Sequence, residues 1–312
     1  MSALSDAKEE VAATLLARRA ASGGFRAGAD ETAESETNEA TAWSVTALRV
    51  SGRATDAQRS GSAYLAGSQA EDGRLSTHPM HPGAYSPTSL AVLAWCGDDE
   101  RRRERERAVE FLTVHSGTTF PRSGDSPLEM DTELAGWPWV DRTFSWVDPT
   151  SFAILALRSA GASAHPRVRE GVRMLLDRQV ESGGWNYGNA RVFGTELRPA
   201  PDSTGVALSA LAGLVSVDEV ERSLALLEVD LERLRTPLSF SWLLLAASAW
   251  DRRPADEELA GACRTILERA ARFGGYETAE LALLLLALEA DRGLLDAVSR
   301  AGAPASRTRS PR

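Results

Sequence analysis

Gln179-Val-Glu-Ser-Gly183-Gly-Trp185 is the most complete copy of a unit that recurs along nearly the whole chain. An amphipathic stretch at residues 168–176 precedes it, and a Gly/Pro-rich loop and an apolar run at residues 206–214 follow it. Gly183 and Gly184 permit the left-handed backbone that ends a helix, and Trp185 can fold back over that end. The Gln179 amide is placed to bond the free carbonyls of the last turn of its own helix.

The copies align on the residue that opens each apolar run. These residues are Thr41, Thr88, Thr150, Thr204, Ser241 and Thr278. Each run is apolar on most sides, which is typical of a helix that is buried all round. The runs occupy residues 42–50, 89–95, 151–157, 205–214, 242–250 and 279–288.

A more polar, amphipathic segment precedes each apolar run. Five such segments are residues 56–68, 104–114, 166–178, 217–233 and 254–271. Amphipathic outer helices that alternate with apolar inner helices imply two concentric layers. Repeats of this size build arrays or rings rather than unrelated domains. We therefore predict an all-α fold, a single α/α toroid of about six helical hairpins at residues 11–298. A flexible N-terminus is expected at residues 1–10 and a disordered tail at 299–312.

Composition excludes several classes of protein. The formal net charge of −9 argues against a nucleic-acid partner, which would require a basic face. Two cysteines, Cys96 and Cys263, are too few for a disulfide framework. The polar N-terminus lacks the apolar core of a signal peptide. No apolar run is long enough to span a bilayer. These features predict a cytoplasmic protein and leave peripheral contact with a membrane open.

The repeat resembles that of the squalene-hopene cyclases, whose signature is Gln-x-x-x-Gly-x-Trp and whose toroid is shared with the β subunits of protein prenyltransferases. A second copy reads Tyr64-Leu65-x-x-x-Gln69-x-x-x-Gly73-x-Leu75, and a third keeps only Arg107-Ala108-x-x-Phe111-Leu112. The first copy keeps Gly23-Gly24-Phe25 and the last Gly274-Gly275-Tyr276. The resemblance covers residues 11–290. Because the chain is too short for the second helical domain of a triterpene cyclase, we expect one toroid.

A candidate binding site lies where the loops that feed the inner helices meet. All inner helices of such a ring run in the same direction, so these loops and the helix N-termini converge at one mouth. Two long loops, residues 117–149 and 183–203, are rich in aromatic residues. The candidate substrate-binding residues are Tyr85, Trp137, Trp139, Phe144, Trp146, Trp185 and Tyr187. An aromatic mouth suits a long hydrophobic ligand, and in the cyclases aromatic faces stabilise carbocations. The alternative is that these tryptophans plug the end of the barrel.

Asp202 and Asp148 are the candidate catalytic residues. The cyclases carry Asp-x-Asp-Asp-Thr at the start of an inner helix, and the middle aspartate protonates the alkene. The matching segment is Ala200-Pro-Asp202-Ser203-Thr204, so Asp202 falls on the proton-donor position and both flanking aspartates are replaced. Asp148 stands two residues before Thr150, as Asp202 does before Thr204. The competing interpretation makes both aspartates helix N-caps, which would lower their pKa and oppose an acid role.

Metal and cofactor chemistry find no support in the sequence. The prenyltransferases hold zinc with Asp, Cys and His, and no Asp-x-Cys pair occurs here. His78 and His81 in a proline-rich loop could touch a metal or a phosphate, although such residues are more often plain surface residues. We therefore predict no metal and no cofactor.

The predicted function is that of a terpenoid cyclase-like or prenyltransferase-like protein. It would act on, or bind, an isoprenoid or similar long hydrophobic molecule in a central apolar cavity. These patterns favour an enzyme over a binding protein. A non-catalytic toroid that binds a lipid or a peptide is the second hypothesis. The third is a carbohydrate-active barrel enzyme that uses two of Asp131, Glu133, Asp141 and Asp148. The substrate, the partner subunit and the oligomeric state stay open.

Overall fold

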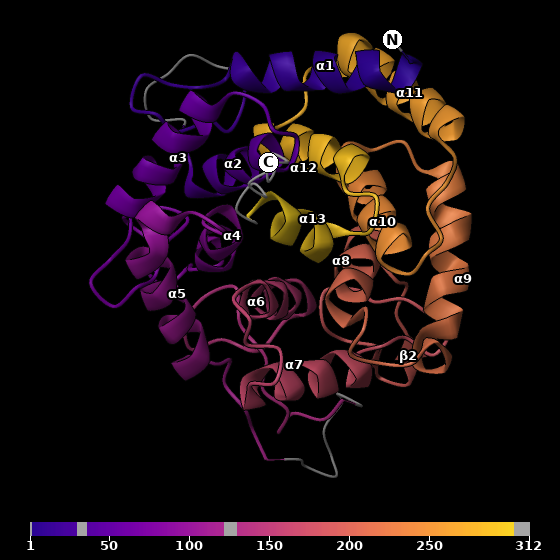
Figure 1. Cartoon of the computed structure of the whole chain (residues 1–312). Coiled ribbons are helices and arrows are strands. Elements are labelled where there is room, and N and C mark those ends of the chain that lie inside the picture. The colour runs from indigo at the N-terminus through magenta and orange to yellow at the C-terminus, as the bar shows by residue number, and fades with distance from the viewer. Residues whose placement is uncertain (1, 30–35, 122–129, 303–312) are drawn as a thin grey trace, which may run out of the picture.

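The computed structural model describes residues 2–29, 36–121 and 130–302, and these residues form a two-layered ring of helices (Figure 1). The inner helices are α2 (Asn38–Val50), α4 (Pro87–Ala94), α6 (Val147–Ser159), α8 (Pro201–Leu211), α10 (Pro237–Ala249) and α12 (Thr278–Glu289). Each inner helix packs against the next, and α12 packs against α2, so the ring closes. The predicted all-α toroid is confirmed.

The outer helices alternate with the inner ones along the chain. They are α1 (Ala3–Leu16), α3 (Thr55–Gly67), α5 (Arg102–Val114, after the short 3-10 helix η2 at Asp99–Arg101), α7 (Pro166–Asp177), α9 (Val217–Arg233) and α11 (Asp256–Phe273). In α7 the buried residues Val168, Gly171 and Leu175 follow one stripe, which is the pattern of a helix with one covered face. In α12 every residue from Leu281 to Leu288 is buried, as an inner position requires.

The residues expected to be a flexible N-terminus form much of α1. Leu4, Ala7 and Val11 are buried there, and α1 packs against α11 and α12. A polar, acidic stretch with apolar residues three and four apart is amphipathic, and this pattern was too short to recognise in the sequence. No helix in the described part of the chain has the length and apolar character needed to cross a membrane.

The aligned threonines have a shared structural role. In four of the five, the hydroxyl oxygen accepts a hydrogen bond from a backbone N–H in the preceding loop, whereas that of Thr278 accepts from the Arg18 guanidinium at 3.1 Å. The donor and acceptor pairs are Phe25 and Thr41 at 2.9 Å, Leu75 and Thr88 at 2.9 Å, Trp137 and Thr150 at 2.9 Å, and Trp185 and Thr204 at 3.0 Å. The third pair identifies Gly136-Trp137 as the Gly-Trp element of the third copy. The sequence comparison missed it because a long loop separates this element from the outer helix.

Thr204→Val is expected to destabilise the protein by about 2 kcal/mol, since the buried N–H of Trp185 loses its acceptor. Guanidinium unfolding would measure the change. Thr14→Val is the matched control, because its hydroxyl bonds only a carbonyl of its own helix and is exposed. Equal stability of the two variants would contradict a clamping role for the inner-helix threonines.

The aromatic residue of the repeat covers the end of the preceding outer helix, as expected. Trp185 Nε1 donates to the carbonyl of Leu175 at 2.7 Å, and Trp137 Nε1 donates to that of Leu112 at 2.9 Å. The glutamine prediction is wrong. Gln179 Nε2 donates to Ser223 Oγ on the next outer helix, α9, at 2.7 Å. The glutamine therefore ties neighbouring repeats together instead of capping its own helix.

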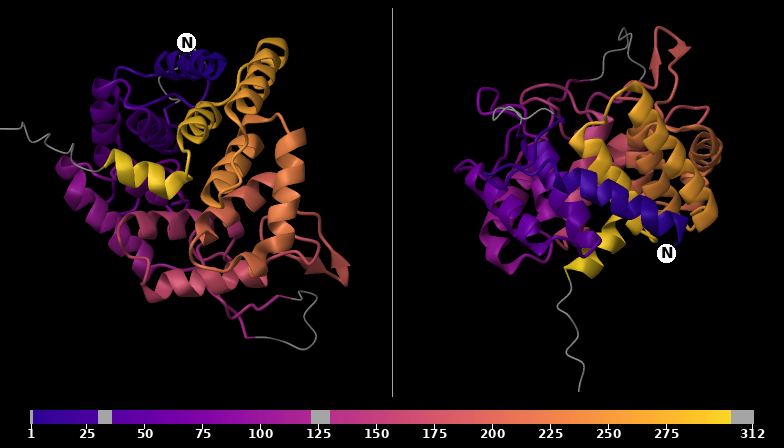
Figure 2. Two further views of the ribbon diagram at one scale, coloured as in Figure 1. Left: turned by 45° about the vertical axis from the view of Figure 1, so that its right-hand side comes forward. Right: turned by 90° about the horizontal axis from the view of Figure 1, so that it is seen from above.

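A thirteenth helix, α13 (Leu294–Ala301), lies across the centre of the ring in Figure 1. It packs against α2, α6 and α12, and its side chains Leu294, Ala297 and Val298 are buried. In the right-hand view of Figure 2 it lies at the opposite end from the hairpin of β1 (Arg191–Val192) and β2 (Thr195–Glu196). The tail predicted from residue 299 therefore begins inside a helix, and residues 303–312 lie outside the described residues.

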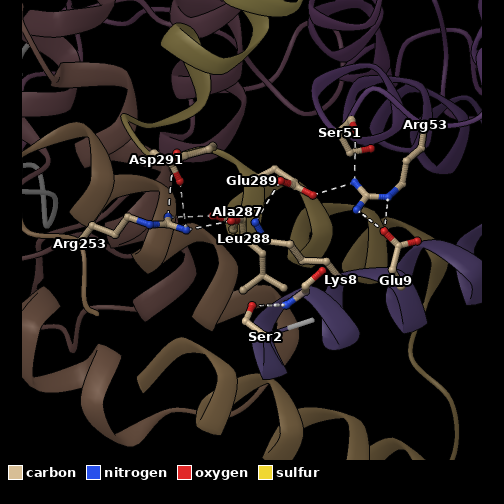
Figure 3. A network of polar contacts seen from close by, with 12 residues as sticks. Ser2, Lys8, Glu9, Ser51, Arg53, Arg253, Ala287, Leu288, Glu289 and Asp291 are labelled. Carbon is tan, nitrogen blue, oxygen red and sulfur yellow. Dashed lines mark hydrogen bonds and ion pairs between the residues drawn. The ribbon is translucent and has the colours of Figure 1, made fainter. Parts of the chain in front are cut away.

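Ion pairs join the first and last hairpins (Figure 3). Glu289 at the end of α12 contacts Arg53 at 2.7 Å and Lys8 of α1 at 3.0 Å. Arg53 also contacts Glu9 at 2.6 Å. In the same view the Arg253 guanidinium donates to the Leu288 carbonyl at 2.9 Å, which satisfies a free acceptor at the end of α12.

Candidate functional site

The mouth of the ring is built on one repeated position, two residues before the aligned threonine. Its occupants are Glu39, Ser86, Asp148, Asp202, Ser239 and Tyr276. Three of these six are carboxylic acids, and each lies in the first turn of an inner helix. The predicted catalytic pair, Asp148 and Asp202, belongs to this set.

Asp148 has the properties of an acid that is still partly protonated at neutral pH. Burial raises the pKa of its carboxyl to about 7, the nearby Ser203 hydroxyl partly opposes this rise, and the negative charge of Asp202 adds to it. Asp148 Oδ1 and Ser203 Oγ are both buried, and neither has a well-aligned hydrogen-bond partner among the described residues. The structure therefore brings Asp148 and Asp202 together, although they are distant in sequence.

The N-cap interpretation of these aspartates is wrong. The cap residue of α6 is Trp146 and that of α8 is Ala200, and neither helix has a side-chain cap bond. Asp148 and Asp202 lie inside their helices at the second position. The sequence prediction placed the start of each helix two residues too late, at Asp148 instead of Trp146 and at Asp202 instead of Ala200. The objection that capping would lower the pKa of an acid here is removed.

Glu39 is a mouth residue that sequence reasoning missed. It lies in the first turn of α2 with its side chain accessible at the mouth, and desolvation by the surrounding protein raises the pKa of its carboxyl. The signal was available, since Glu39-Ala-Thr41, Asp148-Pro-Thr150 and Asp202-Ser-Thr204 share an acid-x-Thr pattern. Glu280, in the first turn of α12, also has its pKa raised by burial.

Three aromatic residues of inner helices lie below the acids. Trp43 comes from α2, Phe152 from α6 and Trp242 from α10. Their ring centroids are 6.2 Å apart for Trp43 and Phe152, 5.6 Å for Trp43 and Trp242, and 5.7 Å for Phe152 and Trp242. We call this cluster the aromatic floor. It was missed because each residue was counted as part of an apolar run.

Four of the predicted aromatic residues lie at the mouth. Trp139 is 36% exposed, Phe144 44% and Tyr187 55%. Trp139 meets Phe152 edge-on, with ring centroids 6.2 Å apart, and so covers the aromatic floor. Trp146 is half-buried and packs against Gly188.

The other three predicted aromatic residues are buried in the walls. Trp137 and Trp185 are 1% and 0% exposed and bond outer helices, so no space of molecular size borders them. Both tryptophans therefore serve packing. They fill the wall of the barrel, whereas the alternative hypothesis had them plug its end. Tyr85 is buried against Phe111 and His115, and burial raises the pKa of its unpartnered phenol.

Metal-ligating side chains are not grouped in the described part of the chain. No set of three or more His, Cys, Asp and Glu residues there could hold a metal ion. The rings of His78 and His81 lie 6.0 Å apart in an exposed loop. Cys96 follows α4, and Cys263 is buried on α11, where burial raises the pKa of its thiol to about 11. A thiol that stays protonated is a poor ligand.

No protein-family model matches the sequence, and no curated protein matches it. Solved structures do share the fold. The type II terpene cyclase MstE from Scytonema matches with a TM-score of 0.60 at 16% identity, over 92% of this chain and 97% of that one. A variant of it bound to its substrate, geranylgeranyl dihydroxybenzoate, matches with a TM-score of 0.59 at 14% identity, over 95% and 97%.

A second class of enzyme has the same fold. The GH76A α-1,6-mannanase of a Salegentibacter species matches with a TM-score of 0.59 at 11% identity, over 92% of this chain and 98% of that one. At such identities a match establishes the α/α toroid and leaves the chemistry to the site itself.

Proposed function

We propose that this protein is a cyclase-like enzyme that protonates an alkene of an isoprenoid substrate, with Asp148 as the general acid. The observation that carries the proposal is the buried Asp148 carboxyl, with a pKa of about 7, beside Asp202 and above the aromatic floor. A proton donor must hold its proton at the working pH and meet the substrate in a site without bulk water. Because Asp148 Oδ1 is buried and the pKa of its carboxyl is raised, we assign the acid to Asp148 and not to Asp202, the residue that the resemblance favoured.

The proposed reaction is an isomerisation that starts with proton transfer from Asp148 and needs no cofactor. The Asp148 proton adds to one alkene carbon, and the π electrons form the new C–H bond and leave a tertiary carbocation. A second alkene or an electron-rich ring attacks that cation, a C–C bond forms, and a proton is then lost to a base. The product is an isomer of the substrate, and Asp148 recovers its proton from water. The face of Phe152, one turn below Asp148, is placed to stabilise the cation.

The fold of MstE supports this proposal, because its structures hold a terpenoid substrate and, in another variant, the product merosterolic acid A. The non-catalytic alternative gives no reason for two neighbouring, partly buried carboxyls at the mouth, where an unpaired charge is costly.

Turnover in deuterium oxide tests the proposed reaction. The protein is incubated with geranylgeranyl dihydroxybenzoate and with shorter prenylated arenes. We expect products isomeric with the substrate that carry one deuterium for each protonation, as measured by mass spectrometry. Release of pyrophosphate from a prenyl diphosphate would indicate a prenyltransferase instead, and unchanged substrates throughout would contradict cyclisation.

A glycosidase is the second candidate. It is favoured by the mannanase fold and by the neighbouring carboxyls of Asp148 and Asp202, of which Asp148 has a raised pKa, since glycoside hydrolysis needs a carboxyl pair. The closely packed aromatic floor argues against it, because sugar hydroxyls need polar partners. Hydrolysis of an α-1,6-mannan by the purified protein, lost in Asp148→Asn, would establish this candidate in place of the cyclase.

A further inference from the structure

The aromatic floor lies on the barrel axis. The helices α2, α6 and α10, which carry its three rings, alternate with α4, α8 and α12 around the ring (Figure 1). These three helices are therefore not adjacent to one another. Side chains from three alternate helices can be within 5.6 to 6.2 Å of one another only where the helices face a common centre. The floor therefore fills the cross-section of the barrel.

The acids stand directly above this floor. Glu39 and Trp43 are four residues apart on α2, and Asp148 and Phe152 are four residues apart on α6. Residues at this spacing lie on the same face of a helix, one above the other. Four residues of α-helix rise by about 6 Å, so the backbone that carries the acids lies about 6 Å above the backbone that carries the floor.

The floor is well packed. Trp43 is 2% and Trp242 3% exposed, and Phe152 is the member that retains partial exposure toward Trp139. Beyond the mouth, the exposed rings of Trp139, Phe144 and Tyr187 offer apolar surface outside the barrel. A long hydrocarbon chain thus has little room below the acids and apolar contacts above them.

We infer that Trp43, Phe152 and Trp242 close the barrel one helical turn below the acids, so that the site admits only the short branched end of an amphiphilic alkene. The depth is comparable to one isoprene unit, and the rest of the molecule lies against the mouth aromatics. This inference rests on the proposed function and narrows its substrate class, away from the long chain in a central cavity that the sequence suggested. Trp43, which meets Phe152 edge-on, is the residue that sets the depth.

Binding to an inactive protein tests the depth. Asp148→Asn retains the barrel and allows affinity to be measured by calorimetry without turnover, using prenol, geraniol, farnesol and geranylgeraniol. Each methylene that becomes buried contributes about 0.8 kcal/mol, so affinity should rise steeply while the chain still enters the barrel. We expect a rise of about 10-fold or more from prenol to geraniol and less than about 3-fold for each later step.

The double variant Asp148→Asn/Trp43→Ala should extend the steep rise to farnesol, with at least about 10-fold tighter binding than in Asp148→Asn. The matched control is Trp250→Ala in the same background, since Trp250 lies at the other end of α10 and bonds Leu208. This control should leave the affinities for farnesol and geranylgeraniol as close to that for geraniol as they are in Asp148→Asn. If Trp43→Ala does not fold, as judged by its thermal transition, Trp43→Leu provides the same comparison with less loss of packing.

Affinity that climbs steeply through geranylgeraniol in Asp148→Asn would overturn the inference, as would a plateau unmoved by Trp43→Ala or Trp43→Leu, or no binding at any length. These results are separate from those for the proposed function. Suppose that the chain length at which affinity stops rising increases as expected, but the protein incorporates no deuterium. This result would support the aromatic floor as the limit of depth and contradict the proposed cyclisation.

Discussion

Asp148→Asn is expected to lower the rate of substrate isomerisation by about 10²- to 10⁴-fold, the range over which general acids contribute, while the protein stays folded. Asparagine has nearly the same shape as aspartic acid and no proton to give. The wild-type rate should also fall as the pH rises through about 7, because ionised Asp148 cannot protonate an alkene. Initial rates between pH 5 and pH 9 would measure both effects.

The same substitution should raise stability at alkaline pH. The folded protein holds the Asp148 proton with a pKa of about 7, above the ordinary value of 3.8. This contribution to stability is fully present below pH 3.8 and is lost as the pH rises through about 7. Three pKa units correspond to about 4 kcal/mol, an upper figure for the cost of the buried charge. Asp148→Asn should therefore melt at a higher temperature than wild type at pH 8 and at a similar one at pH 4.

Two variants serve as controls for Asp148→Asn. Asp202→Asn removes a charge that raises the pKa of Asp148, so the alkaline limb of its rate profile should move to lower pH. Glu133→Gln removes an exposed acid of the loop before α6 and should change neither rate nor stability. An Asp148→Asn protein with full activity, or one that melts lower at pH 8, would refute the assignment of a protonated buried acid.

Gly205→Ala is expected to destabilise the protein by about 3 kcal/mol, although the same change in most helices is stabilising. Gly205 is the place where α8 meets α10. A Cβ there would lie 2.5 Å from the Trp242 carbonyl carbon and 2.7 Å from the Leu243 nitrogen. These are backbone atoms of a neighbouring helix, which cannot rotate away as a flexible side chain can, so two inner helices would have to separate.

Gly261→Ala is the matched comparison for Gly205→Ala. Gly261 is also inside a helix, α11, and a Cβ there would meet nothing within 4 Å. We expect it to stabilise the protein by about 0.5 to 1 kcal/mol, because alanine restricts the unfolded chain and favours the helix. Guanidinium unfolding of the two variants should give changes of opposite sign. Changes of the same sign would mean that the close approach at Gly205 is not required.

The sequence was sufficient for the architecture because the repeat is local. Alternating polar and apolar segments predicted the helices, and the aligned threonines proved to make the same hydrogen bond in four copies. The Gly-Trp element of the third copy was not recognised in the sequence, because the long loop before Trp137 separates it from its outer helix. The spacing inside one hairpin thus decides its geometry, so the helices could be read from a single sequence.

The site was harder to predict because it forms from helices distant in sequence. The carboxyls of Asp148 and Asp202 were both proposed, but only the ring shows that they are neighbours and that desolvation raises the pKa of Asp148. Trp43 and Trp242 looked like ordinary core residues, since nothing local indicates that α2 and α10 face a common axis. Exposure likewise separated Trp139 from Trp185, which the sequence had treated alike.

The ion pair between Arg53 and Glu289 joins residues 236 positions apart. The barrel therefore cannot be completed during synthesis until both have been made. A nascent chain that ends before α12 leaves apolar faces of α2 and α10 without their partner. Such an open arc exposes hydrophobic surface until nearly all of the protein has left the ribosome, which is a condition that favours aggregation and chaperone binding. Contacts between such remote segments also slow folding, because a long loop must close before they form. Translation arrested before residue 278 should therefore give a chain that is captured by chaperones, whereas release after Glu289 allows the ring to close.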